Sequence, residues 1–292
     1  MKTEKTIHHY ILTRFNLALW TKDKAGKEIG DTGWLERRMR LFETFCLPSV
    51  ASQTSKDFEW ILLLDENTPE VYLERIKGYK ERCRQIRPIK VRSGYGAHFA
   101  KIFQSVVTDS LSRCVAKEGD LCLTTYLDND DSIVRDFVED VQRRCASLPV
   151  TEENGVFLSY DYGLQLYADM GNVTTRILYP NNHFITYAES IRNGRHVRTC
   201  YGYGSHFLIE KNGMARVEHV VEKKKPMWIE VIHKENVDND VKMTIHTCLV
   251  KDRETLRRDF ALDMAVGEGH RLRLAVRIIL QAWRRLKEKR KR

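Results

Sequence analysis

An acidic cluster follows one of the most apolar stretches of the chain. Asp128, Asp130 and Asp131 come directly after residues 121–127, a run typical of a buried strand. Carboxylates this close repel one another unless a cation compensates them, and their hard oxygen atoms suit Mn²⁺ or Mg²⁺. Such a cation could bridge a diphosphate and stabilise a departing phosphate. Alternatively, Asp130 or Asp131 caps a helix beginning near Ser132, although a cap needs only one acidic residue.

Alternating strand and helix patterns in the first half of the chain must position this cluster. Apolar runs predict strands at residues 7–12, 58–64, 86–91 and 121–127, and helical spacing predicts helices at 34–47, 97–115 and 132–145. Pro48 is expected to end or bend the first helix, and Pro69 to open another. This alternation predicts an α/β fold with a parallel sheet, whose ligands gather beyond the carboxyl ends of the strands.

The second half of the chain has a different pattern. Short alternating stretches lie at residues 156–160, 163–167, 174–179, 198–209 and 227–232. They predict a mixed or antiparallel extension of the sheet, with loops that could form an acceptor pocket.

Polar residues also follow the other predicted strands. Arg14 and Asn16 follow the first strand and Asp65 the second, so we expect them near Asp128 at one edge of the sheet. The Arg14 guanidinium could pair with a phosphate or stack on a base, or it could be an ordinary surface charge.

Charge and composition exclude several classes of protein. The net charge of +9 resides in residues 271–292, which hold ten Lys or Arg and one Glu, so the remaining chain is neutral and nucleic acid is not an expected partner. The seven cysteines are scattered and form no CxxC pair, which favours reduced thiols. No signal peptide or spanning stretch is apparent. We therefore expect a cytoplasmic protein.

The basic C-terminal segment has its own pattern. From His270 the apolar residues recur at helical spacing, at positions 272, 275, 276, 279, 280, 283 and 286, with arginines between them. Such a helix can lie on an anionic membrane surface, or it can pack against its own domain. We expect a catalytic domain at residues 1–265 and a basic amphipathic tail at 266–292.

Several of these segments together resemble a known family. They are residues 34–38 (WLERR), 41–50 (LFETFCLPSV), Gln53, 58–60 (FEW), Asp65, 127–131 (LDNDD), 182–186 (NHFIT), Glu189, Trp228, His233 and Asn236. The similarity covers residues 7–240 and points to the bacterial family described as putative rhamnosyltransferases.

This resemblance implies a glycosyltransferase of the GT-A type, with an α/β Rossmann-like sheet and a mixed C-terminal half. It implies a nucleotide-sugar donor, with rhamnose as one candidate sugar, and a glycan or lipid-linked acceptor. By position, Asp128 and Asp130 resemble the family's metal and diphosphate ligands, and His233 resembles a late histidine that completes the metal shell; His206 and His246 are alternatives. The expected nucleotide-sugar-binding residues are Thr13, Arg14, Asn16, Asp65, Asp128 and Asn129.

Transfer with inversion also requires a base for the acceptor hydroxyl. Glu189 is the first candidate and Asp161 the second, although either could be a structural or surface carboxylate. Two other functions stay open. One is an adaptor that uses only the basic tail on a membrane or nucleic acid. The other is a different metal-dependent nucleotide enzyme, although we find neither a GxxxxGK[ST] nor a GxSxG motif.

Overall fold

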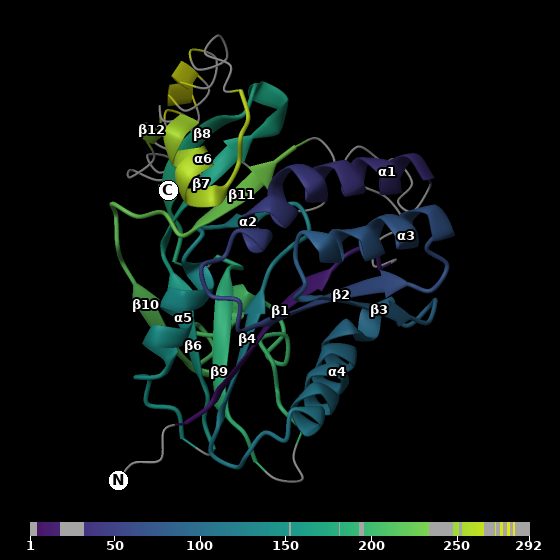
Figure 1. Ribbon diagram of the computed structural model, residues 1–292. Coiled ribbons are helices and arrows are strands. Elements are labelled where there is room, and N and C mark those ends of the chain that lie inside the picture. Colours follow the sequence, from purple (N-terminus) through teal and green to yellow (C-terminus); the bar gives the residue numbers. More distant parts are fainter. Residues whose placement is uncertain are drawn as a thin grey trace.

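The computed structural model is shown in Figure 1. It describes residues 5–17, 32–151, 153–180, 182–192, 196–233, 248–250 and 253–265, together with Leu272, Ala275, Val276, Ile279, Leu280 and Trp283. The strands are β1 Ile7–Arg14, β2 Glu59–Asp65, β3 Ile86–Val91, β4 Leu121–Tyr126, β5 Ser132–Ile133, β6 Val156–Tyr160, β7 Tyr162–Tyr167, β8 Val173–Leu178, β9 Ile185–Ser190, β10 Arg216–Val220, β11 Trp228–Ile232 and β12 Cys248–Val250. The α-helices are α1 Thr32–Leu41, α2 Leu47–Ala51, α3 Glu70–Gly78, α4 Phe99–Arg113, α5 Phe137–Cys145 and α6 Arg253–Phe260.

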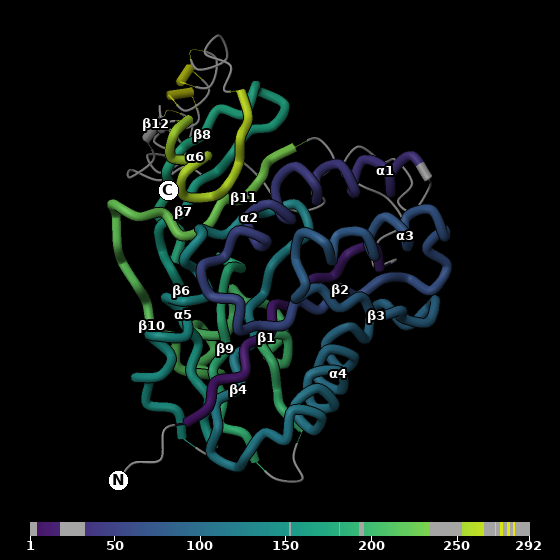
Figure 2. The backbone as a smooth tube through the Cα atoms, viewed as in Figure 1, coloured from purple at the N-terminus to yellow at the C-terminus, as the bar shows by residue number. Residues whose placement is uncertain are grey.

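The larger sheet has seven strands in the order β10-β6-β9-β4-β1-β2-β3. Strands β3, β2, β1 and β4 are parallel, as the alternating pattern predicted. Strand β9 runs antiparallel to both β4 and β6, and β10 is parallel to β6. The carboxyl ends of β1, β2, β4, β6 and β10 therefore lie at one edge, which Figure 2 shows near the crossing to the second sheet.

The smaller sheet has five strands in the order β12-β8-β7-β11-β5. The chain passes from the larger to the smaller sheet at three points: between β4 and β5, between β6 and β7, and between β10 and β11. The acidic cluster lies in the first crossing, and Asp161 is the single residue between the two strands of the second. The topology thus brings two sets of predicted site residues to the junction of the sheets.

Packing on both faces holds the central strands in place. In β2, Trp60, Leu62 and Leu64 belong to one core cluster, whereas Ile61 and Leu63 belong to the other. Alternate side chains point to opposite faces of a strand, so a strand buried on both faces is apolar throughout. The predicted α/β fold with a mixed second half is therefore confirmed.

Three local expectations differ from the structure. The helix predicted to end or bend at Pro48 does not end there: a π-helical turn, η1 Phe42–Cys46, joins α1 to α2, with the Leu47 N–H donating to the carbonyl of Phe42. Such a turn shifts the bonding pattern before a residue that lacks an N–H group. The helix predicted at 132–145 begins only at Phe137, because residues 132–133 form β5. The stretch 198–209 forms turns, not a strand.

Candidate active site

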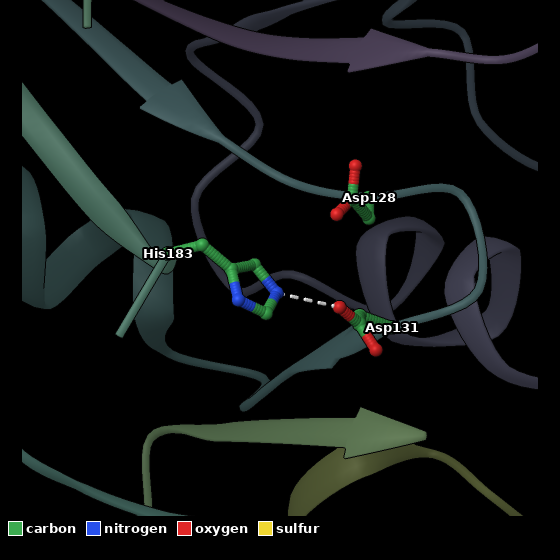
Figure 3. Close-up of side chains that lie close together, drawn as sticks. All are labelled: Asp128, Asp131 and His183. Atoms are coloured by element: carbon green, nitrogen blue, oxygen red, sulfur yellow. Dashed lines mark hydrogen bonds and ion pairs between the residues drawn. The ribbon is translucent and has the colours of Figure 1, made fainter. Parts of the chain in front are cut away.

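Three ligand-bearing side chains meet beyond the carboxyl end of β4. Asp128 and Asp131 come from the turn between β4 and β5, and His183 comes from the segment that leads into β9 (Figure 3). One carboxylate oxygen of each aspartate and one imidazole nitrogen lie within 4.8 Å of one another. Two hard oxygen ligands and an imidazole form a donor set that suits a first-row divalent cation. We refer to these residues as the carboxylate–histidine trio.

Asp131 and His183 form the buried half of the trio. The His183 Nε2 atom lies 2.7 Å from an Asp131 carboxylate oxygen, and the other Asp131 oxygen accepts a hydrogen bond from the Val231 N–H. Burial raises the pKa of Asp131. Burial lowers the pKa of His183, but the hydrogen bond and charge of Asp131 outweigh it and leave that pKa raised. Both shifts favour retention of a proton between the two groups, in the place that a cation would take.

Asp128 forms the exposed half of the trio. Its carboxylate lies 3.3 Å from the Arg14 guanidinium and accepts a hydrogen bond from the Tyr126 hydroxyl. The Arg14 guanidinium in turn lies over the rings of Phe99, Tyr126 and Tyr201, at 4.8 to 5.6 Å from their centroids. Arg14 is thus fixed beside the trio by an ion pair and three aromatic rings.

Asp130 has a different set of partners from the trio. Its carboxylate lies 2.6 Å from the Arg38 guanidinium and 2.8 Å from His233 Nε2. Burial raises the pKa of Asp130, but Arg38 and His233 together lower it below the ordinary value. Asn129 accepts a hydrogen bond from Arg38 and donates one to the carbonyl of Phe15. Of the expected metal ligands, the structure brings Asp130 and His233 together, and places Asp128 with a different pair.

The remaining nucleotide-binding candidates occupy different positions. Asn16 accepts a hydrogen bond from the backbone of Asp65 and donates one to Thr68, so it links β1 to the loop after β2. Asp65 accepts hydrogen bonds from the Asn67 backbone and the Ser93 hydroxyl at the same edge as the trio. Thr13 is buried in the core, where its hydroxyl accepts a hydrogen bond from the indole of Trp60.

The two candidate bases lie at opposite edges of the sheet. Glu189 pairs in register with Cys122, six residues before Asp128, which corresponds to about 20 Å along the strand. Its carboxylate accepts backbone N–H bonds from Arg198 and Thr199 and lines a separate cavity of 180 Å³. Asp161 follows β6 at the edge that also carries Asp128.

Of the two alternative histidines, the structure describes only His206. The His206 ring lies 5.9 Å from that of His183 and 6.4 Å from that of Tyr126, beside the trio. His246 lies outside the described residues.

Five residues of this edge are absent from the predicted site residues: Arg38, Tyr126, Asp131, His183 and His219. Asp131 belongs to the acidic cluster that the sequence indicated, but it was not among the expected ligands. Arg38 and His183 lie in segments that carry the family resemblance, so that resemblance could have indicated them. Tyr126 ends a strand and His219 lies on an edge strand with little apolar character, so no sequence pattern distinguished either.

The fold and this edge define an α/β protein whose ligand site lies beyond the carboxyl ends of its parallel strands. Residues 11–245, most of the chain, match a family model described as "Putative rhamnosyl transferase", and the chain belongs to that family. It is therefore a glycosyltransferase, which confirms the predicted enzyme class.

No curated protein matches the chain. Among solved structures, the crystal structure of S. aureus TarS 1–349 is similar, with a TM-score of 0.38 and 10% sequence identity, over 77% of this chain and 60% of that one. The chain thus spans less than two thirds of that structure.

Proposed function

We propose that this glycosyltransferase uses a divalent cation and a nucleotide-diphosphate sugar, and that the carboxylate–histidine trio is the centre of its donor site. The observation that carries the proposal is the convergence of Asp128, Asp131 and His183 within 4.8 Å at the carboxyl edge of the sheet. We place donor binding along that edge, between Asp128 and Asp65, which flank β1. Two strand spacings, about 10 Å, separate them.

The residues of the trio fit a resident cation. Asp131 and His183 are fully buried and held by each other, whereas the Asp128 side chain is 27% exposed and faces the open edge. A cation held by two fixed protein ligands and one accessible protein ligand keeps coordination positions for phosphate oxygens. Bound there, Mn²⁺ or Mg²⁺ would withdraw charge from the leaving diphosphate.

Charged side chains of the protein would act together with the cation. Arg14 is permanently charged and already beside Asp128, so it can pair with a phosphate oxygen when the donor enters. Asp130 is neutralised by Arg38 and His233, which leaves it little free charge for a ligand. We therefore assign Asp130 a structural role beneath the trio instead of the metal-ligand role expected from its position. Asn16 and Asp65 would contact the nucleoside at the far end of the donor.

For the acceptor side we propose the edge of the sheet that carries Asp161, as one member of the proton-accepting group, over the edge that carries Glu189. Transfer requires that the acceptor hydroxyl reach the sugar next to the diphosphate, so its proton acceptor must share an edge with the trio. Asp161 meets this requirement, and Glu189 lies about 20 Å away at the other end of β9.

Thermal-shift measurements test the donor site, because a ligand that binds the native state raises the melting temperature. We expect UDP-, GDP- or dTDP-sugars to raise it only when Mn²⁺ is present, and Asp131→Asn to abolish this dependence. Glu189→Gln, at the opposite edge, is the control and should respond as the wild type does. If no nucleotide sugar gives a metal-dependent shift in the wild type, the proposal fails.

The C-terminal tail supports a second proposal, about location. Among the described residues no helix is long and apolar enough to cross a bilayer. Leu272, Val276, Ile279, Leu280 and Trp283 are helical and between 48% and 76% exposed, which argues against packing on the domain. The segment 271–292 also carries ten basic residues and one acidic residue. We propose that this segment binds an anionic lipid surface, where a membrane-linked acceptor would be within reach.

Liposome sedimentation tests this location. The full chain should sediment with vesicles that contain phosphatidylglycerol and much less with pure phosphatidylcholine, because each basic residue near an anionic surface contributes about 1 kcal/mol. Removal of residues 270–292 should abolish sedimentation and leave the melting temperature within a few degrees. A truncated chain that still sediments with anionic vesicles would exclude the tail as the anchor.

A further inference from the structure

A histidine–aspartate pair lies at the same edge of the sheet as the proposed donor site. His219, on the edge strand β10, has its Nδ1 atom 2.7 Å from a carboxylate oxygen of Asp161. The Asp161 side chain is 6% exposed and is also approached by the Ser159 hydroxyl, whereas the His219 side chain is 23% exposed. The carboxylate is therefore the inner member of the pair and the imidazole is the outer one.

The pair occupies the trio's edge of the sheet. His219 is in register with Ser159 on β6, and Ser159 is in register with Ile185 on β9, two residues after His183. Two strand spacings, about 10 Å, thus separate His219 from the start of β9. A hexose attached to a diphosphate at the trio would extend into this interval.

We propose that His219 is the general base for the acceptor hydroxyl, with Asp161 as the residue that orients it, and that the acceptor is a sugar ring held against Tyr179 and Phe207. This inference rests on the proposed donor site and assigns the residues that bind and deprotonate the acceptor. The acceptor O–H proton passes to His219 Nε2 while the acceptor oxygen bonds to the anomeric carbon. The bond from that carbon to the diphosphate oxygen breaks, and its electron pair leaves with the diphosphate.

The hydrogen bond to Asp161 sets the chemistry of the imidazole. When Nδ1–H donates to the carboxylate, the lone pair of the neutral ring resides on Nε2, the nitrogen that must accept the proton. Glu210, whose side chain is 56% exposed, lies 3.4 Å from Nε2. An acceptor hydroxyl can take this place, because an exposed glutamate exchanges its contact for water at little cost.

Two aromatic residues lie near the pair. The Tyr179 N–H donates to the backbone carbonyl of Asp161 at 2.7 Å, and the Tyr179 ring lies 6.2 Å from that of Phe207. Phe207 is 45% exposed and precedes Glu210 by three residues in the same turn region. The exposed face of Phe207, next to the half-buried Tyr179, offers apolar area for the C–H face of a pyranose, with the base at its rim.

The same contacts determine how transfer should depend on pH. Burial lowers the pKa of His219, but its hydrogen bond to Asp161 and the charges of Asp161 and Glu210 outweigh burial and leave that pKa raised. The base works only when neutral, so the acid limb of transfer should lie above the ordinary histidine pKa of about 6.5. Without the Asp161 charge this limb should move to lower pH.

Kinetics of transfer from the nucleotide sugar to p-nitrophenyl glycosides test the assignment. We expect His219→Gln to reduce kcat by about 10²- to 10⁴-fold and to leave the Mn²⁺-dependent thermal shift unchanged. Asp161→Asn should lower kcat and move the acid limb to lower pH. Phe207→Ala should raise the acceptor KM several-fold, whereas Met214→Ala, equally exposed in the same segment, should not.

Several results would overturn the proposal. A wild-type rate in His219→Gln excludes it as the base, and an equal change of KM in Phe207→Ala and Met214→Ala excludes the aromatic subsite. If nucleotide sugars give no Mn²⁺-dependent thermal shift in the wild type, the proposed donor site fails instead. Nitrogen-detected NMR of the histidine ring needs no turnover: His219 should carry its neutral-state proton on Nδ1 and show a lower pKa in Asp161→Asn. An Nε2–H tautomer or an unchanged pKa would contradict the proposal.

Discussion

Three carboxylates within four residues have three separate environments. Asp128 pairs with Arg14, Asp130 with Arg38 and His233, and Asp131 with His183. Like charges this close would otherwise oppose folding, so each carboxylate has its own cationic or proton-sharing partner. As a result, Asp130 is held in an ion pair within the protein, and Asp128 and Asp131 are available to a ligand.

The Arg38–Asp130 pair should therefore contribute to stability more than to catalysis. Both side chains are 10% exposed or less. Arg38→Met leaves the buried Asp130 carboxylate with His233 as its remaining charge partner among the described residues, and should lower the free energy of unfolding by about 3 to 5 kcal/mol. Urea denaturation measures this loss.

The double variant provides the control for that pair. Arg38→Met combined with Asp130→Asn removes both charges, and should recover much of the lost stability because no buried charge stays uncompensated. If the single variant is as stable as the wild type, the pair is not a structural element of the site.

Sequence patterns located the cluster but not the direction of each side chain. A buried strand followed by acidic residues identified Asp128 to Asp131 correctly as an edge feature. Which aspartate faces which partner depends on the turn between β4 and β5 and on strands from residues 183 and 228 onward. Those contacts join positions 50 to 100 residues apart, and short-range spacing carries no information about them.

At the scale of elements, close packing between β7 and β11 supports the trio. Gly163 on β7 lies beneath the Trp228 ring of β11, where an added Cβ would be 2.1 Å from a ring carbon. Trp228 stacks on Phe184, the residue after His183, with ring centroids 4.7 Å apart. A side chain added at Gly163 should therefore displace the Trp228 ring, and with it Phe184 and the neighbouring His183 of the trio.

Gly163→Ala tests this coupling. It should lower the free energy of unfolding by about 1 to 3 kcal/mol, because the ring must move in a fully packed core, and weaken Mn²⁺ binding as well. Gly78→Ala is the matched control: no atom would lie within 4 Å of the new Cβ, and the helical position favours alanine by about 0.5 to 1 kcal/mol. Equal effects of the two substitutions, measured by thermal unfolding, would contradict the coupling.

The parallel half of the larger sheet was predictable and the rest much less so. Strands β1, β2 and β4 are largely buried and contain apolar runs, which sequence patterns detect well. Strand β10 is a half-exposed edge strand of sequence RVEHV, which lacks such a run. The two-residue strand β5 was assigned to a helix because its isoleucine continues the helical spacing of α5.

At the scale of the whole molecule, both halves of the proposed reaction lie where the chain crosses between sheets. The β4–β5 crossing supplies Asp128 and Asp131, and the β6–β7 crossing supplies Asp161. His183 and His219 lie on or beside strands that pack around β6. This arrangement explains how residues nearly 100 positions apart can serve one transfer step, with donor and acceptor entering from neighbouring strand ends.

The central claim is that Asp128, Asp131 and His183 hold the catalytic cation, and titration of Mn²⁺ followed by electron paramagnetic resonance tests it most directly. The account predicts that the wild type and Glu189→Gln each remove about one equivalent of the free Mn²⁺ signal, because binding quenches it, and that Asp131→Asn and His183→Gln weaken binding by at least about tenfold. Undiminished Mn²⁺ binding in both trio variants, with their folds intact, would contradict it.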